Sequence, residues 1–354
     1  MSKQPTVTLI VTQRERFSLT QASLDSILAD YESYPFQLIY VDGNSPPETS
    51  QYLQEQAQKY PFMTLIRKER YLRSNTARNL ALPLTQSADY VAFLDNDVIV
   101  EPGWLKTLVD CAEAEQAGIV SPLILQGQPG SPDIEVHVAG IKTKFRKRKW
   151  GKRWFEQKQL LYATQLKDVE HTLYRTTVDS IEFHCILVRR SYLESARLDE
   201  VFDSLAGHTD LCFQVKALGG KVFLEPTSKV TFLNPRQITG FTREDVNFYM
   251  FKWNDPFVRK NFVHSARKWG LGSDDPTIWS IWRWVIENRQ IPATLATQEG
   301  TFLRKLLEIS QKRWCPPHLR MLLESFVLKK AFPATGIPSN LDLNQRTPLE
   351  QSVS

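Results

Sequence analysis

The chain of 354 residues is 42% hydrophobic and 23% charged, a composition typical of a folded globular protein with room for two domains. No apolar run approaches the roughly 18 residues that a membrane-spanning helix needs, and no signal-peptide pattern opens the sequence. These features predict a cytoplasmic protein without a membrane span. The cysteines lack the spacing of metal ligands and are expected to be reduced thiols (Cys111, Cys185, Cys212 and Cys315).

The formal net charge of +5 is concentrated in one segment, because eight Lys or Arg residues lie between Lys142 and Arg153. Aromatic residues such as Trp150 and Trp154 are interleaved with them. Such a mixture suits an anionic partner, and nucleic acid is one candidate. A solvated charged loop is the alternative interpretation.

Short apolar runs alternate with segments of helical periodicity along the first two thirds of the chain. The runs predicted as strands are residues 7–11, 37–41, 64–66, 91–94, 118–125, 181–189 and 221–224. The segments predicted as helices include residues 24–31, 52–60, 74–84, 101–117 and 209–218. This alternation predicts an α/β fold with a mostly parallel sheet flanked by helices.

The strand predicted over residues 91–94 ends at two carboxylates, Asp95 and Asp97. Four consecutive apolar residues indicate a strand buried on both faces. In an open α/β sheet ligands bind outside the carboxyl ends of the strands, and two neighbouring carboxylates there can hold Mg²⁺ or Mn²⁺. Thr12 and Asp42 follow two other predicted strands, so these residues are expected to gather at one edge of the sheet. The alternative for the Asp-x-Asp triplet is a solvated loop.

Four sequence elements occur in a characteristic order. The first strand leads into a polar loop, and the second ends in the turn 41–45 (Val-Asp-Gly-Asn-Ser). The tripeptide 77–79 (Ala-Arg-Asn) and the segment 93–97 (Phe-Leu-Asp-Asn-Asp) follow. Together they resemble the nucleotide-binding half of a family-2 glycosyltransferase of bacterial polysaccharide or cell-envelope type. The resemblance implies a GT-A fold, which is a Rossmann-like, mostly parallel sheet with flanking helices.

The resemblance also implies roles for individual residues at a nucleotide-sugar site. Asp42 would accept a hydrogen bond from the base of the donor, commonly uracil. Thr12, at the end of the first strand, belongs to the same predicted donor site. Arg73 or Arg78 would lie near the base or the phosphates, although each could be an ordinary surface arginine.

The same resemblance implies a metal site. Asp95 would face the ribose and the metal, and Asp97 would ligate the Mn²⁺ or Mg²⁺ that bridges the donor's diphosphate. A fixed divalent cation stabilises the negative charge that a leaving nucleoside diphosphate gains. Many members add a metal-binding His after a later strand, but residues 230–233 contain none, so the metal would rest on Asp97, the diphosphate and water. His184 is expected to be a hydrogen-bonded core residue and not a ligand.

The second signature of the family departs here from its usual form. The common pattern is Glu-Asp-x-Asp-Leu at the start of a helix, and its second carboxylate is the expected base. Gly207 and His208 stand in the places of the two acids, while Asp210 and Leu211 match. A neutral imidazole is a competent general base near pH 7. His208 is therefore predicted to be the catalytic base, with Asp210 in the same catalytic set.

After about Pro235 the alternation stops and helical spacing of apolar residues predicts helices. We expect a catalytic domain over residues 1–235 and a helical extension over residues 236–354, with a disordered last dozen residues. The predicted function is inverting hexosyl transfer from a UDP- or GDP-linked sugar to a hydroxyl of a glycan or lipid-linked acceptor. For such an enzyme the basic segment is expected to face a lipid phosphate, the anionic inner face of the cell membrane or the donor's diphosphate, and not nucleic acid. One alternative is a non-catalytic relative that binds nucleotide or glycan. Another is a sugar-nucleotide pyrophosphorylase, although residues 12–16 lack the glycine-rich loop of that class.

Overall fold

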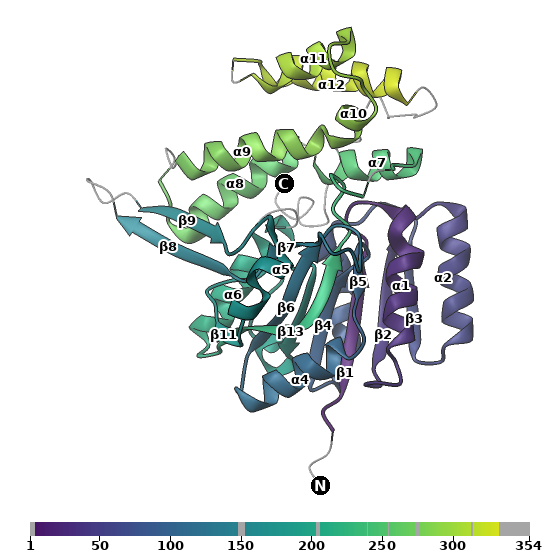
Figure 1. Ribbon diagram of the computed structural model, residues 1–354, viewed down its shortest axis with the longest axis vertical. Coiled ribbons are helices and arrows are strands. Elements are labelled where there is room, and N and C mark those ends of the chain that lie inside the picture. Colours follow the sequence, from purple (N-terminus) through teal and green to yellow (C-terminus); the bar gives the residue numbers. More distant parts are fainter. Residues whose placement is uncertain are drawn as a thin grey trace, which may run out of the picture.

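The computed structural model describes residues 4–147, 153–202, 206–238, 240–253, 255–272, 276–312 and 314–332. Strands and helices alternate as far as residue 232, and only helices follow in the described part of the chain (Figure 1).

The strands are β1 (Val7–Thr12), β2 (Gln37–Gly43), β3 (Met63–Lys68), β4 (Tyr90–Asp95), β5 (Val98–Val100), β6 (Ile119–Gln126), β7 (Glu135–Val138), β8 (Ile141–Lys147), β9 (Arg153–Gln159), β10 (Thr164–Gln165), β11 (Thr176–Thr177), β12 (Cys185–Arg189) and β13 (Val222–Phe232). The α-helices are α1 (Thr20–Ala29), α2 (Pro47–Lys59), α3 (Ser74–Ala81), α4 (Trp104–Ala114), α5 (Leu166–Val169), α6 (Gly207–Ala217), α7 (Arg243–Lys252), α8 (Asp255–Trp269), α9 (Pro276–Arg289), α10 (Ile291–Leu295), α11 (Phe302–Gln311) and α12 (Pro317–Ala331).

The central sheet has the strand order β10-β7-β6-β12-β4-β1-β2-β3. Strands β3, β2, β1 and β4 are parallel to one another, and β13 is parallel to β6. Strand β12 lies antiparallel between β4 and β6. The predicted α/β class with a mostly parallel central sheet and flanking helices is confirmed.

Both faces of the sheet are buried, and this explains why its strands are uninterrupted apolar runs. Side chains alternate along a strand, so Leu9 and Val11 join the core beneath α1, α2 and α4, whereas Ile10 joins the core beneath α3 and α6. Burying one such side chain contributes roughly 1.5–3 kcal/mol to folding. The sheet is therefore a rigid platform for the residues at the ends of its strands.

The carboxyl ends of β1, β2 and β4 meet at one edge of the sheet, as predicted. Thr12 lies opposite Asp95 in the register of β1 and β4, and Asp42 belongs to the neighbouring β2. The backbone N–H of Asn96 donates to the Thr12 carbonyl at 3.0 Å, which joins the turn after β4 to the end of β1.

Helices α7, α8 and α9 lie over this edge of the sheet (Figure 1). Asp245 of α7 accepts hydrogen bonds from the backbone N–H groups of Phe17 (2.6 Å) and Ser18 (3.1 Å), and it completes a capping box with Thr242. Phe17 and Phe248 stack with ring centroids 4.6 Å apart. The start of the helical segment is thus fastened to the loop after β1.

The helical character predicted beyond residue 235 agrees with these helices, while the division into two domains at residue 235 stays a prediction. The predicted disordered tail lies outside the described residues. No helix in the described ranges is both long enough and apolar enough to span a bilayer.

Strands β8 and β9 form an antiparallel hairpin that carries the basic segment (Figure 1). Its aromatic side chains anchor it to the protein, because the ring of Phe155 lies 5.1 Å from that of Trp269 and the ring of Phe145 lies 5.5 Å from that of Phe213. These two phenylalanines therefore pack against the protein, and contact of the basic segment with an anionic partner stays a prediction. Residues 148–152, which include Trp150, lie outside the described residues.

Candidate active site

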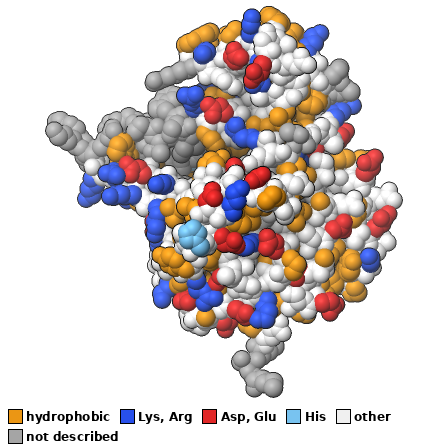
Figure 2. Space-filling model, viewed as in Figure 1, with side chains coloured by type: hydrophobic (Ala, Val, Ile, Leu, Met, Phe, Trp, Pro, Cys, Tyr) orange, Lys and Arg blue, Asp and Glu red, His pale blue; other side chains and the backbone are white. Residues whose placement is uncertain are grey.

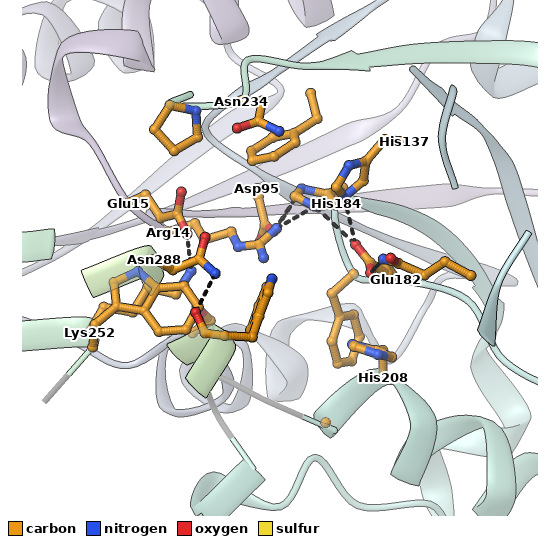
Figure 3. A pocket seen from close by; sticks show the side chains of 18 of the residues that line it. Arg14, Glu15, Asp95, His137, Glu182, His184, His208, Asn234, Lys252 and Asn288 are labelled. Carbon is orange, nitrogen blue, oxygen red and sulfur yellow. Dashed lines mark hydrogen bonds and ion pairs between the residues drawn. The ribbon is translucent and has the colours of Figure 1, made fainter. Parts of the chain in front are cut away.

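A cavity of about 310 Å³ lies where the loop after β1, the end of β4, the start of β12 and the start of α6 meet α7 and α9 (Figure 3). Many charged and histidine side chains line this cavity. They are Arg14, Glu15, Arg78, Asp95, His137, Glu182, His184, His208, Arg236 and Lys252.

Asp95 is a buried carboxylate with two cationic partners. Arg78 Nη2 donates to its Oδ1 at 2.7 Å, and Arg14 Nη1 donates to its Oδ2 at 3.2 Å. Burying an ionised carboxylate is costly unless it is paired and hydrogen-bonded, and the two arginines meet that requirement. Arg78, predicted to lie near the donor, is on the cavity wall beside Asp95.

Asp97 has no such compensation. Its side chain is 1% exposed, yet neither carboxylate oxygen has a hydrogen-bond partner. Burial raises the pKa of Asp97 to about 7. An unpaired buried carboxylate beside a polar cavity is the arrangement expected of a cation ligand.

The donor set around Asp97 fits a divalent metal. One ligand atom from each of Asp95, Asp97 and His184 lies within 4.8 Å of the others. His184 Nδ1 is 3.8 Å from Asp95 Oδ2 and 4.0 Å from Asp97 Oδ1. Two carboxylate oxygens and one imidazole nitrogen suit Mn²⁺ and admit Mg²⁺.

His184 is buried and hydrogen-bonded, as the sequence predicted, but it also forms part of the cavity wall. The antiparallel insertion of β12 beside β4 places it there, because the Asp95 N–H donates to the His184 carbonyl at 3.1 Å. A histidine within an apolar strand carries no sequence signal of this proximity.

Glu182 was missed by the sequence analysis and lies at the centre of a hydrogen-bonded cluster. Its Oε2 is 3.1 Å from His137 Nε2 and 3.2 Å from His184 Nε2, and its Oε1 accepts from Gln159 Nε2 at 2.5 Å. Burial by itself raises the pKa of Glu182, but His137 and His184 hold that pKa well below its ordinary value. Glu182 is therefore an ionised carboxylate within the cavity.

His208, the second residue of α6, lies on the cavity wall with its Nε2 shielded from solvent and without a hydrogen-bond partner. This shielding lowers the pKa of His208 to about 4. Asp210 lies differently, because its Oδ2 accepts from Lys268 Nζ at 2.8 Å and its Oδ1 accepts from Trp269 Nε1 at 3.3 Å. The cavity thus contains His208, while Asp210 binds α6 to α8.

Asp42 is fully buried, and both of its oxygens already have donors. Gln13 Nε2 donates to Oδ1 at 2.8 Å, Ser45 Oγ donates to Oδ2 at 2.9 Å, and Arg67 forms an ion pair with Oδ2. Arg67, which the sequence analysis did not single out, is the cationic partner here. Recognition of the base by Asp42 stays a prediction.

The other two residues predicted for the donor site also have defined surroundings. The guanidinium carbon of Arg73 lies 4.5 Å from the centroid of the Phe251 ring and 3.2 Å from that of Phe257. Thr12 is buried at the end of β1, and its hydroxyl has no hydrogen-bond partner. Their donor-binding roles stay predictions.

Similarity to known proteins agrees with this geometry. The chain is 24% identical over 236 residues to the O-antigen biosynthesis protein RfbC of Myxococcus xanthus, covering 62% of this chain and 16% of that protein. It is 25% identical over 117 residues to the hyaluronan synthase of Pasteurella multocida, covering 33% of this chain and 12% of that protein. The chain thus matches less than a fifth of the length of either relative.

Among solved structures, the crystal structure of GalNAc-T7 with UDP, GalNAc and Mn²⁺ superposes with a TM-score of 0.52 at 15% identity, covering 72% of this chain and 49% of that one. At this identity the likeness concerns the fold, and it supports the GT-A assignment. The sequence model of the family described as glycosyl transferase family 2 matches residues 8–196. Since this match includes more than half of the chain, the protein belongs to glycosyl transferase family 2.

Proposed function

We propose that the protein transfers a hexosyl group from a nucleotide-sugar donor, UDP- or GDP-linked, to a hydroxyl of a glycan or lipid-linked acceptor, with inversion at the anomeric carbon. The observation that carries this proposal is the buried carboxylate of Asp97, which has no hydrogen-bond partner and lies beside Asp95 and His184. Asp95 and His184 line the same cavity as His208. This arrangement supports a metal-assisted diphosphate site with a candidate base nearby.

Asp95, Asp97 and His184 would hold the divalent cation, which supplies positive charge to the leaving diphosphate when bound. Arg78 adds a fixed positive charge at the same wall, since its guanidinium is already held by Asp95. Preorganised charge of this kind lowers the barrier to departure because no reorganisation is needed during the reaction.

His208 would accept the proton of the acceptor hydroxyl at Nε2. Its lowered pKa keeps the imidazole neutral near pH 7. The acceptor oxygen then forms a bond to the anomeric carbon while the bond from that carbon to the diphosphate oxygen breaks. Asp210, through Lys268, would keep α6 and hence His208 in position.

A non-catalytic binding protein is the second candidate, and the pKa of about 4 for His208 favours it, because a weaker base accepts a proton less readily. Steady release of nucleoside diphosphate from a nucleotide sugar in the presence of an acceptor would identify the protein as an enzyme, and a non-catalytic binding protein would release none.

The first test is calorimetric titration of the full chain with UDP and GDP, with and without Mn²⁺. We expect UDP or GDP to bind, and we expect its affinity to be at least about tenfold higher with Mn²⁺ than without it. The reason is that the cation offsets the repulsion between the diphosphate and the buried carboxylates. Magnesium should substitute in part. Absence of binding by either nucleotide in the presence of Mn²⁺ would contradict the proposed function.

The basic hairpin supports a further part of the proposal, namely peripheral contact with an anionic membrane. Figure 2 shows Lys and Arg side chains gathered on the side of the molecule where Figure 1 places β8 and β9. Exposed cations near a negative surface contribute about 1 kcal/mol each, and salt screens them.

Replacing four exposed basic residues of β8 by Ser should weaken association with phosphatidylglycerol vesicles by about tenfold or more. The four are Lys142, Lys144, Arg146 and Lys147. Vesicle co-sedimentation at two salt concentrations measures the effect. A control with the same charge change replaces by Ser four exposed lysines on helices α2, α4, α11 and α12 (Lys59, Lys106, Lys305 and Lys329). Equal binding by both variants and the wild type would make the hairpin an ordinary solvated surface.

A further inference from the structure

The guanidinium of Arg14 lies among the atoms that suit a metal ion. Its Nη1 is 2.5 Å from His184 Nδ1, 2.7 Å from His184 Nε2 and 3.2 Å from Asp95 Oδ2 (Figure 3). The side chain comes from the loop after β1, where the Asn96 side chain accepts from the Arg14 N–H at 2.9 Å. Asn96, which lies between Asp95 and Asp97, therefore holds the backbone of Arg14 in place.

Glu182 lies on the other side of His184, with Oε2 3.2 Å from His184 Nε2. A carboxylate only accepts hydrogen bonds, so Glu182 favours the tautomer of His184 that carries its proton on Nε2. His184 Nδ1 is then a lone pair on the side of Asp95 and Asp97. Metal-ligating histidines are oriented in this way by carboxylates.

One lone pair cannot serve two cations. His184 Nδ1 can accept from Arg14 or ligate a metal ion, and a guanidinium next to a divalent cation is repelled by it. We propose that Arg14 and the divalent cation compete for His184 Nδ1, so that metal binding moves the Arg14 guanidinium to the donor's diphosphate. This inference rests on the proposed function, because the diphosphate is the anion that would receive Arg14.

The surroundings of Arg14 favour such a movement. Its side chain is 20% exposed and borders the cavity, so it can turn without opening the core. The neighbouring carboxylate of Glu15 is already paired with Lys252 Nζ at 2.9 Å. A phosphate in the cavity therefore offers a displaced guanidinium a counter-charge and bidentate acceptor geometry.

The competition predicts effects of opposite sign for one substitution. Arg14→Gln should bind Mn²⁺ about tenfold more tightly than the wild type, because a competing cation is removed. The same variant should bind the nucleoside diphosphate about tenfold more weakly in saturating Mn²⁺, because a charge-assisted hydrogen-bond donor is lost. A merely structural role of Arg14 would weaken both.

The test is calorimetric titration of the chelator-treated full chain with MnCl₂ alone, followed by titration with UDP or GDP in saturating Mn²⁺. Arg236→Gln is the matched control, since it removes the same charge from an exposed part of the cavity wall. Arg14→Lys keeps the positive charge but lacks the planar guanidinium that can donate two hydrogen bonds to a phosphate. This variant should bind Mn²⁺ like the wild type and the nucleoside diphosphate more weakly.

Tighter Mn²⁺ binding by Arg14→Gln but not by Arg236→Gln supports the competition, as does Mn²⁺ binding that only Arg14→Gln displays. Mn²⁺ binding by Arg14→Gln that is unchanged or weaker than that of the wild type overturns the competition. Absence of Mn²⁺ binding by both the wild type and Arg14→Gln also overturns it. These results are separate from the fate of the proposed function, which depends on nucleotide binding by the wild type.

Discussion

Asp97→Asn is expected to stabilise the metal-free protein while abolishing its response to metal. Burial raises the pKa of Asp97 from 3.8 to about 7, so keeping this carboxylate ionised costs free energy in the folded state. The shift corresponds to about 4 kcal/mol above pH 7. The buried amide of Asn also lacks partners, so we expect a net gain of about 1–3 kcal/mol in the free energy of unfolding.

The sign of the pH dependence follows from the raised pKa. Below about pH 4 Asp97 is protonated in both the folded and the unfolded states, so the substitution should be nearly neutral there. As the pH rises through 7, the folded state loses stability relative to a chain without this carboxylate, and the gain from Asn becomes complete. Urea unfolding at pH 4 and pH 8 in the presence of a chelator measures this difference.

The substitution Asp97→Asn is expected to impair function although it stabilises the metal-free protein. Without the Asp97 carboxylate, Mn²⁺ should no longer raise the melting temperature or the nucleoside diphosphate affinity, and turnover should fall by about two orders of magnitude or more. Asp110→Asn, an exposed change on α4, is the control. A variant that is no more stable at pH 8 than the wild type would contradict the raised pKa of Asp97, and a variant that still responds to Mn²⁺ would show that Asp97 does not hold the metal.

His208→Ala should lower turnover by about 10²–10⁴-fold and leave donor affinity nearly intact, because a general base acts on the acceptor proton and not on the donor. Its pKa of about 4 means that the imidazole stays neutral across the range from pH 5 to pH 8. The acid limb of the wild-type pH profile should therefore lie near pH 4 and not near 6.5, the value of an exposed histidine. Steady-state kinetics across this range measures both quantities.

A matched control is available in His171→Ala, which removes an exposed histidine of the same chain. The conservative change His208→Asp should recover part of the lost turnover. Near-normal turnover of His208→Ala would place the base elsewhere, and Glu182 is the next residue to test because its ionised carboxylate borders the same cavity.

The sequence by itself determined the α/β architecture and the position of the acidic pair. Apolar runs of strand length separated by helical periodicity reflect which side chains face a core, and this information is local. Asp95 and Asp97 could be placed at a ligand-binding edge because they directly follow a strand buried on both faces. His208 was found from the family resemblance, because it stands where the second signature of the family usually has an acid.

Only the tertiary structure decided which side chains surround that pair. Arg14 and His184 are 170 residues apart in sequence, and they meet because β12 enters the sheet antiparallel beside β4. Likewise, Glu182 becomes part of the cavity through contacts with His137 and Gln159 on other segments. Strand order and direction depend on packing across the whole sheet, which a local pattern of polar and apolar residues does not record. The arginine and histidine side chains that surround Asp95 and Asp97 could therefore be identified only from the assembled fold.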